Sequence, residues 1–153
     1  MKKFLMILLI GLSLFTVSAR AYDRADGFGI GLSAGYPVAG VAFKYGMGDF
    51  RIVGTLGYSF NDTIAIEAGV QYDLDRFYFD RLPIYMNIGI TGAANFSPVL
   101  EGFSINIPVG LSYFFTDAPV ELFFKLTPGV KIRSTSAEPD FGAAIGILFY
   151  LNR

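Results

Sequence analysis

An alternation of side chains with a period of two residues runs through residues 120–132, VELFFKLTPGVKI, and constrains the fold more than any other feature. One set of alternate residues is wholly apolar, whereas the other carries Glu121, Lys125 and Lys131. Successive side chains of a β-strand point to opposite faces, so the pattern predicts a strand with one apolar face and one charged face. In a water-soluble barrel the apolar face would be the core. In a membrane barrel it would contact lipid, and the charges would lie in the lumen.

The same alternation recurs in seven other segments, and turn-forming residues separate them. The eight expected strands are residues 27–36, 41–45, 50–60, 63–74, 82–93, 103–115, 120–132 and 141–151. No helical pattern interrupts the series, which argues against a parallel sheet. An even number of strands of about ten residues is typical of a transmembrane barrel. We therefore predict an all-β fold, an eight-stranded antiparallel up-and-down transmembrane β-barrel.

Glycine and aromatic residues indicate which face is inside. Glycine gathers on the face opposite the apolar one, and it fits the narrow interior of an eight-stranded barrel better than an exposed strand surface. The apolar face carries aromatic residues near the strand ends, as expected of the two girdles of a lipid-facing wall. These are Tyr36, Tyr58, Phe60, Phe103 and Phe141 at one rim, and Tyr45, Phe50, Tyr72, Tyr113, Phe115 and Phe149 at the other. The charges are thus expected to point inward. The alternative is a secreted lipocalin-like barrel that binds an apolar ligand.

The N-terminal segment has the order of a secretory signal peptide. Lys2 and Lys3 precede an apolar run at residues 4–17, and Ala19-Arg20-Ala21 supplies small residues at the positions that a signal peptidase reads. The run is shorter than the roughly 20 residues of a spanning helix, and no later segment is long and apolar enough to be one. We expect a signal peptide at residues 1–21 and one domain, an outer-membrane β-barrel, at residues 22–153.

Composition narrows the partners of the mature chain. After Lys2, Lys3 and Arg20 leave with the signal peptide, nine basic residues remain against thirteen acidic ones, a net charge of −4. No basic patch suggests a nucleic-acid partner. The chain contains no cysteine and no histidine, so disulfides, thiolate metal sites and a Ser–His catalytic pair are excluded.

The remaining chemistry would depend on carboxylates. Glu67, Asp73 and Glu121 could form a histidine-free site, but ion pairs within the lumen are the simpler interpretation. The acidic groups near the expected turns lack the regular spacing of a calcium loop and are interpreted as solvated. They are Asp23 and Asp26, and Asp73, Asp75 and Asp80. We therefore expect no enzymatic activity, no cofactor and no metal site.

Three stretches resemble a family of small bacterial outer-membrane barrels, with the overall architecture of the OmpA membrane domain and OmpX. They are SAGYPVAGVAFKY (33–45), LPIYMNIGI (82–90) and PVELFFKLTPGV (119–130). The resemblance implies a location in the bacterial cell outer membrane and no established activity. It also implies two partners, the lipid bilayer of that membrane and the outer-membrane assembly machinery. A monomer is expected.

The candidate site is a lumen charge network. Its members all lie on the small-residue face: Lys44, Arg51, Glu67, Asp73, Glu121, Lys125 and Lys131. Unpaired charges in so narrow a space would be costly, so they are expected to pair and plug the pore. Expected turns set Lys44 opposite Arg51 and Arg51 opposite Asp73, while Glu67 and Lys125 could meet across the lumen. The function that follows is a structural barrel without an open pore, with at most minor solute or lipid passage. With the N-terminus in the periplasm, the outward connections are short, so surface binding or adhesion is the alternative.

Two prolines lie within expected strands, and proline cannot donate a ladder hydrogen bond. A four-residue turn after Phe115 sets Pro108 opposite Thr127 and Pro128 opposite Ile107, so the two prolines would be neighbours on one seam. The simpler interpretation is a tolerated bulge at each. The sharper hypothesis is a lateral seam at Pro108 and Pro128 that admits an acyl chain from the outer leaflet.

Overall fold

The computed structural model describes residues 26–59, 63–97, 99–133 and 135–151. The expected signal peptide and Phe60 lie outside these ranges. The described residues form nine strands and, within the same ranges, no helix has the length and apolar character needed to cross a membrane. The strands are β1 (Gly27–Tyr36), β2 (Ala39–Met47), β3 (Phe50–Tyr58), β4 (Ile64–Phe79), β5 (Leu82–Ser97), β6 (Val99–Asn106), β7 (Val109–Phe114), β8 (Val120–Arg133) and β9 (Ser136–Tyr150).

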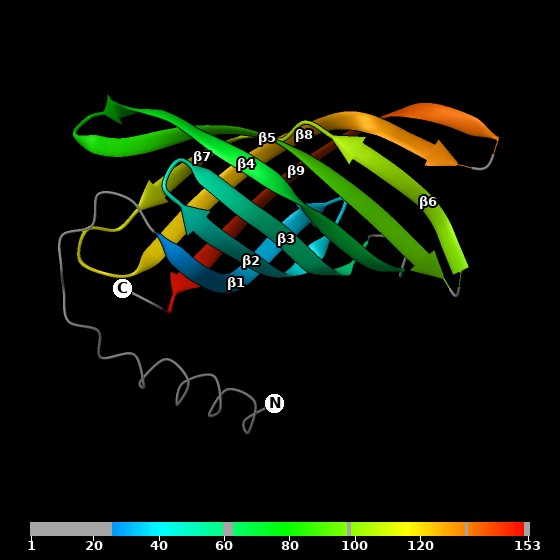
Figure 1. Ribbon diagram of the computed structural model, residues 1–153, viewed down its shortest axis with the longest axis horizontal. Coiled ribbons are helices and arrows are strands. Elements are labelled where there is room, and N and C mark those ends of the chain that lie inside the picture. The colour runs from blue at the N-terminus through cyan, green and yellow to red at the C-terminus, as the bar shows by residue number, and fades with distance from the viewer. Residues whose placement is uncertain (1–25, 60–62, 98, 134, 152–153) are drawn as a thin grey trace, which may run out of the picture.

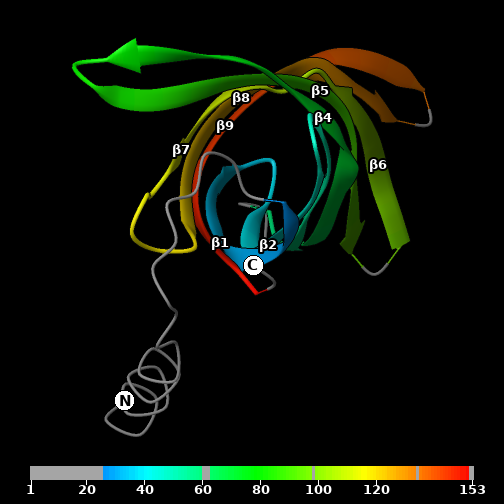
Figure 2. The ribbon, with the colours of Figure 1, turned by 60° about the vertical axis from the view of Figure 1, so that its left-hand side comes forward.

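The strands close into one antiparallel ring (Figures 1 and 2). Sequential neighbours pair from β1 to β5, β8 pairs with β9, and β9 pairs with β1. β6 and β7 share one position, since each pairs with β5 on one side and with β8 on the other. The all-β antiparallel class is confirmed. The expected eight continuous strands are corrected in one respect, because the strand expected at 103–115 is interrupted at Ile107-Pro108.

The pairings also fix the stagger of the ring. A path that starts at Glu121 on β8 and follows directly paired residues around the ring returns to β8 at Lys131, ten residues further along. For eight strand positions, this stagger corresponds to strands tilted by about 41° from the barrel axis. The path passes through Leu148, Gly31, Ala42, Thr55, Glu67, Ala93 and Ser104.

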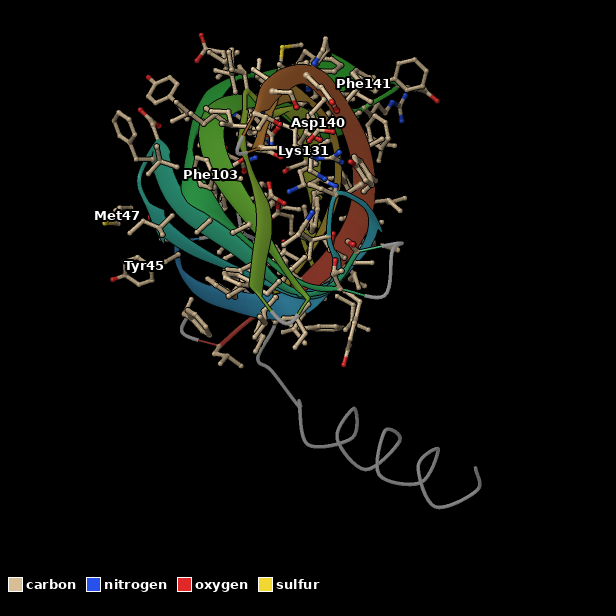
Figure 3. All side chains as sticks on the ribbon, turned by 90° about the vertical axis from the view of Figure 1, so that its right-hand side faces the viewer. Tyr45, Met47, Phe103, Lys131, Asp140 and Phe141 are labelled. Carbon is tan, nitrogen blue, oxygen red and sulfur yellow. The ribbon has the colours of Figure 1, made fainter. Side chains whose placement is uncertain are left out.

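The apolar face is the outer face of the ring. On β8, Glu121 is fully buried whereas Leu122 is 41% exposed, and this alternation continues to Thr127 and Pro128. Figure 3 shows Tyr45 and Met47 outside the ring, and Lys131 and Asp140 inside it. A wall with this much exposed apolar surface needs an apolar surrounding.

Two ends of the barrel are distinguished below. The terminal end is the one at which β1 begins and β9 ends, on the left in Figure 1, and the distal end is the opposite one. Several strands run further than expected: β4 and β5 form a hairpin across residues 75–81 at the terminal end, where a turn was expected. The expected pattern stopped at Leu74 because a bulge between Asp73 and Arg76 shifts the alternation by one residue.

Candidate functional site: the charged lumen

Glu121 is the centre of a buried cluster in the terminal half of the lumen. Its Oε1 accepts hydrogen bonds from Lys44 Nζ and Ser112 Oγ, each at 2.6 Å, and its Oε2 accepts one from the Tyr150 hydroxyl at 2.5 Å. Ser112 Oγ in turn accepts a hydrogen bond from Asn87 Nδ2 at 3.1 Å. These side chains come from five strands, so the cluster ties together residues that are far apart in sequence.

A second ion pair lies beside this cluster. Arg51 Nε donates to Asp73 Oδ2 at 2.5 Å, and Arg51 Nη1 lies 3.3 Å from the Tyr150 hydroxyl oxygen. Arg51 is 1% exposed and Asp73 is 3% exposed. The Tyr150 hydroxyl therefore links the Arg51–Asp73 pair to the Glu121 cluster.

Aromatic rings pack against these cations. The Arg51 guanidinium lies 5.1 Å from the centroid of Phe114, and Lys44 Nζ lies 4.6 Å from the centroid of Phe123. Phe114 also packs edge-on against Tyr85, with centroids 5.4 Å apart. The cations are thus desolvated on the side of the rings, where cation–π attraction offsets part of the cost.

A third ion pair crosses the middle of the lumen. Lys125 Nζ donates to both carboxylate oxygens of Glu67, at 2.8 Å each, and joins β8 to β4. A cavity of ≈ 20 Å³ lies between this pair and the Glu121 cluster, bordered by Lys44, Gln71 and Asn87 among others. A space of this size holds about one water molecule.

The distal half of the lumen is polar but mostly uncharged. Thr91, Asn106 and Thr127 are at most 2% exposed. Their side-chain oxygen atoms, and the Asn106 amide nitrogen, have no hydrogen-bond partner among the described residues. The side chains of the Glu121 cluster, in contrast, are joined to one another by hydrogen bonds.

The distal mouth carries Asp140 and Lys131 (Figure 3). Asp140 accepts hydrogen bonds from the Tyr36 hydroxyl at 3.0 Å and from Ser104 Oγ at 3.1 Å. Lys131 is half-buried on β8, directly opposite Ser104 and Glu138. Six of the seven residues of the predicted network thus meet in three ion pairs, while Lys131 lies apart from them at the mouth.

The structure corrects two of the expected registers. Gly46, not Lys44, lies opposite Arg51, because the β2–β3 turn is at Gly48-Asp49. Gln71, not Asp73, lies opposite Arg51 on β4, and the long guanidinium side chain reaches Asp73 diagonally. Each register is shifted by two residues, which leaves every side chain on the expected face.

The backbone keeps its register at both prolines. Thr91 pairs with Asn106 and Ile88 with Val109, so no bulge occurs at Pro108, and Pro128 pairs with Phe141 in regular register. The expected bulges are therefore absent. The Gly89 amide donates to the Pro108 carbonyl at 2.9 Å, and the Ile107 amide donates to the Pro128 carbonyl at 2.8 Å.

The backbone N–H groups that the two prolines lack would each have pointed to a different neighbouring strand. In an antiparallel pair the N–H and C=O of one residue point to the same neighbour. Pro108 therefore lacks its donor toward β5, whereas Pro128 lacks its donor toward β6. Pro108 lies in the lumen and Pro128 on the outer face, so each seam is weakened at one bond only.

Several lumen residues were not among the predicted site residues, in particular Ser112, Asp140 and Tyr150. The signal for Tyr150 was present, since a tyrosine on a face otherwise built from glycine, alanine and one leucine indicates a specific hydrogen-bond partner. No group of three or more acidic side chains that could hold a metal ion occurs within the described ranges.

Comparison with known proteins agrees with this architecture. The family model described as outer membrane protein beta-barrel domain matches residues 7–149. The search of curated proteins and the search of solved structures each returned no match. The family model covers nearly the whole chain, so the outward apolar wall lies in the lipid of the bacterial outer membrane, and the lipocalin-like alternative is set aside. The chain belongs to the family of outer-membrane proteins with a β-barrel domain.

Proposed function

We propose that this protein is a structural barrel of the outer membrane with a closed lumen and no open pore. The observation that carries the proposal is the pair of charged layers: the Glu121 cluster in the terminal half and the Glu67–Lys125 pair in the middle. Opening a path would separate buried charges from their partners, which costs several kcal/mol per ion. Solute or lipid passage would therefore be slow and would require these pairs to rearrange.

The proposal includes an orientation and a monomeric state. The terminal end faces the periplasm, as expected after removal of a signal peptide at residues 1–21. The ring of strands closes on itself, so it leaves no sheet edge within the bilayer that a second copy must cover.

The distal connections support a structural role over surface recognition. β5 and β6 are separated by residue 98 alone, and β8 and β9 by residues 134–135. Recognition surfaces are usually carried by longer loops. Surface binding therefore ranks below the structural role.

The lumen also offers little for catalysis. Ser112 lies against a carboxylate, but its hydroxyl is engaged by Glu121 and Asn87. The sequence contains no histidine that could activate it. We infer that the protein is not an enzyme.

Recording from the purified protein in planar lipid bilayers tests the proposal. The wild-type barrel is expected to insert without steady conductance. The quadruple variant Lys44→Met/Glu67→Gln/Glu121→Gln/Lys125→Met is expected to conduct, because the Lys44–Glu121 and Glu67–Lys125 ion pairs are then removed. Asp117→Asn, at an exposed turn position, is the control and is expected to stay silent. Steady wild-type conductance would refute the closed lumen.

A further inference from the structure

The β4–β5 hairpin extends beyond its neighbours at the terminal end. The register of β3 with β4 ends at Phe50 and Tyr72, and the Asp73 amide donates a hydrogen bond to the Asp49 carbonyl at 2.8 Å. β4 nevertheless continues to Phe79, paired with β5. The bulge before Arg76 bends the strand pair, and Figures 1 and 2 show it leaning away from the ring. Residues 74–84 are called the projecting hairpin below.

One face of the projecting hairpin is apolar. Phe77 lies directly opposite Ile84, and Phe79 lies directly opposite Leu82, so these four side chains share a face. Ile84 also pairs with Tyr113 and is two residues from the outward-facing Met86. The apolar face therefore continues the lipid-facing wall of the barrel.

The other face and the tip are polar. Arg76 lies over the ring of Tyr78, with its Cζ 5.6 Å from the ring centroid. The tip is the two-residue turn Asp80-Arg81, in which both residues have positive φ, 44° and 73°. This is the conformation of a type I′ hairpin turn, and the two side chains supply opposite charges.

The free edge of β4 limits where this hairpin can lie. Among the described residues, positions 77–79 of β4 pair with β5 alone. Their outward backbone groups need hydrogen-bond partners that the hydrocarbon core cannot provide. Water and headgroups at the membrane–water boundary can provide them, and aromatic side chains with one apolar side suit that boundary.

We propose that the projecting hairpin is an anchor in the interface of the lipid bilayer. Phe77, Phe79 and Leu82 pack against the lipid at the level of the headgroups. Arg76, Tyr78 and the charged tip face water and headgroups. The occupant of the apolar face is lipid, because that face is continuous with the established lipid-facing wall, and the exposed fraction of Phe79, 68%, is otherwise unexplained in water.

Tryptophan fluorescence tests this proposal, because the chain contains no tryptophan. Phe79→Trp places a single probe on the apolar face, and Tyr78→Trp places a matched probe on the opposite face. Each variant is refolded into phosphatidylcholine vesicles at low protein-to-lipid ratio, and a shift in migration between unboiled and boiled samples on gels verifies the barrel.

The emission of Phe79→Trp is expected to be blue-shifted, quenched by lipid brominated near the headgroup, and protected from acrylamide. Tyr78→Trp is expected to remain open to acrylamide. Equal acrylamide quenching of the two probes would place the hairpin in water and overturn the proposal. Loss of the Phe79→Trp protection on further dilution into lipid would identify a second copy as the occupant and would overturn it equally.

Discussion

The two halves of the lumen differ in the kind of buried polar group that they hold, mainly charged in the terminal half and mainly neutral in the distal half. In the terminal half, Glu121 accepts three hydrogen bonds and Arg51 pairs with Asp73. In the distal half, Thr91, Asn106 and Thr127 are equally buried, yet their side-chain oxygen atoms have no partner within the described ranges. A buried charge must be paired because its desolvation is so costly, whereas a neutral hydroxyl or amide costs far less. Removing one partner of a buried ion pair in the charged half is therefore expected to cost more than removing a neutral group in the distal half.

Removal of the central carboxylate should have the largest effect. Glu121→Ala leaves Lys44 buried without its partner, and it also removes the acceptor for Ser112 and Tyr150. The free energy of unfolding is expected to fall by about 3–5 kcal/mol. Urea unfolding of the barrel in vesicles, followed by circular dichroism, measures this loss. Glu138→Ala, at an exposed position on β9, is the control, and an equal loss in both variants would show that the cluster is not special.

The assignment of faces could be predicted from the sequence, and so could the six charged residues that pair in the lumen. The period of two in strands places Glu121, Lys125 and Glu67 on one side whatever the exact pairing, because a shift of register by two residues preserves the face. The precise partners could not be predicted in the same way. Arg51 reaches Asp73 only through a diagonal contact, which depends on turn geometry and on the length of the guanidinium side chain.

Crowding in the distal half should produce the next largest effect. A β-carbon on Gly129 would overlap the Asn106 amide oxygen and the carbonyl oxygen of Ile105, which is backbone and cannot move without disturbing the sheet. Gly129→Ala is expected to lower the free energy of unfolding by about 1–3 kcal/mol. Gly102→Ala is the matched control, since its nearest neighbour would be the flexible Lys131 Cε at 3.3 Å. Equal losses in the two variants would contradict the crowding argument.

The projecting hairpin shows why other features escaped prediction. The bulge between Asp73 and Arg76 inserts one residue into β4, so the residues beyond it no longer follow the alternation of the strand before it. The sequence Asp73 to Arg81 also combines charges with aromatic residues, a composition that suits a turn as well as a strand. Only the pairing with β5 distinguishes the two.

The two prolines should have smaller effects, each on its own seam. Pro108→Ala restores a donor toward β5 and Pro128→Ala restores one toward β6, so each is expected to stabilise the barrel by up to about 1 kcal/mol. Membrane permeability is expected to stay unaltered in both. If an acyl chain entered laterally between these strands, both substitutions would instead alter lipid binding there. A cross-link through introduced cysteines would alter it as well.

The smallest change in the free energy of unfolding is expected when a buried hydroxyl without a hydrogen-bond partner is removed. Thr127→Val keeps the shape of the side chain and deletes a buried oxygen that has no partner among the described residues. The stability is expected to change by less than about 0.5 kcal/mol, or to rise. Ser112→Ala, which removes a hydroxyl bonded to Glu121, is the comparison in the terminal half and is expected to lose about 1–2 kcal/mol. A larger loss for Thr127→Val than for Ser112→Ala would reverse the contrast between the halves.

A double-mutant cycle on the pair that crosses the lumen tests the central claim most directly. The free energy of unfolding is measured for wild type, Glu67→Gln, Lys125→Met and the double variant, with the same cycle on Thr91→Val and Thr127→Val as the reference in the distal half. If paired charges hold the lumen closed, the Glu67–Lys125 coupling should be about 1–3 kcal/mol, and the Thr91–Thr127 coupling should be near zero. A Glu67–Lys125 coupling no larger than that of the threonines would contradict the account.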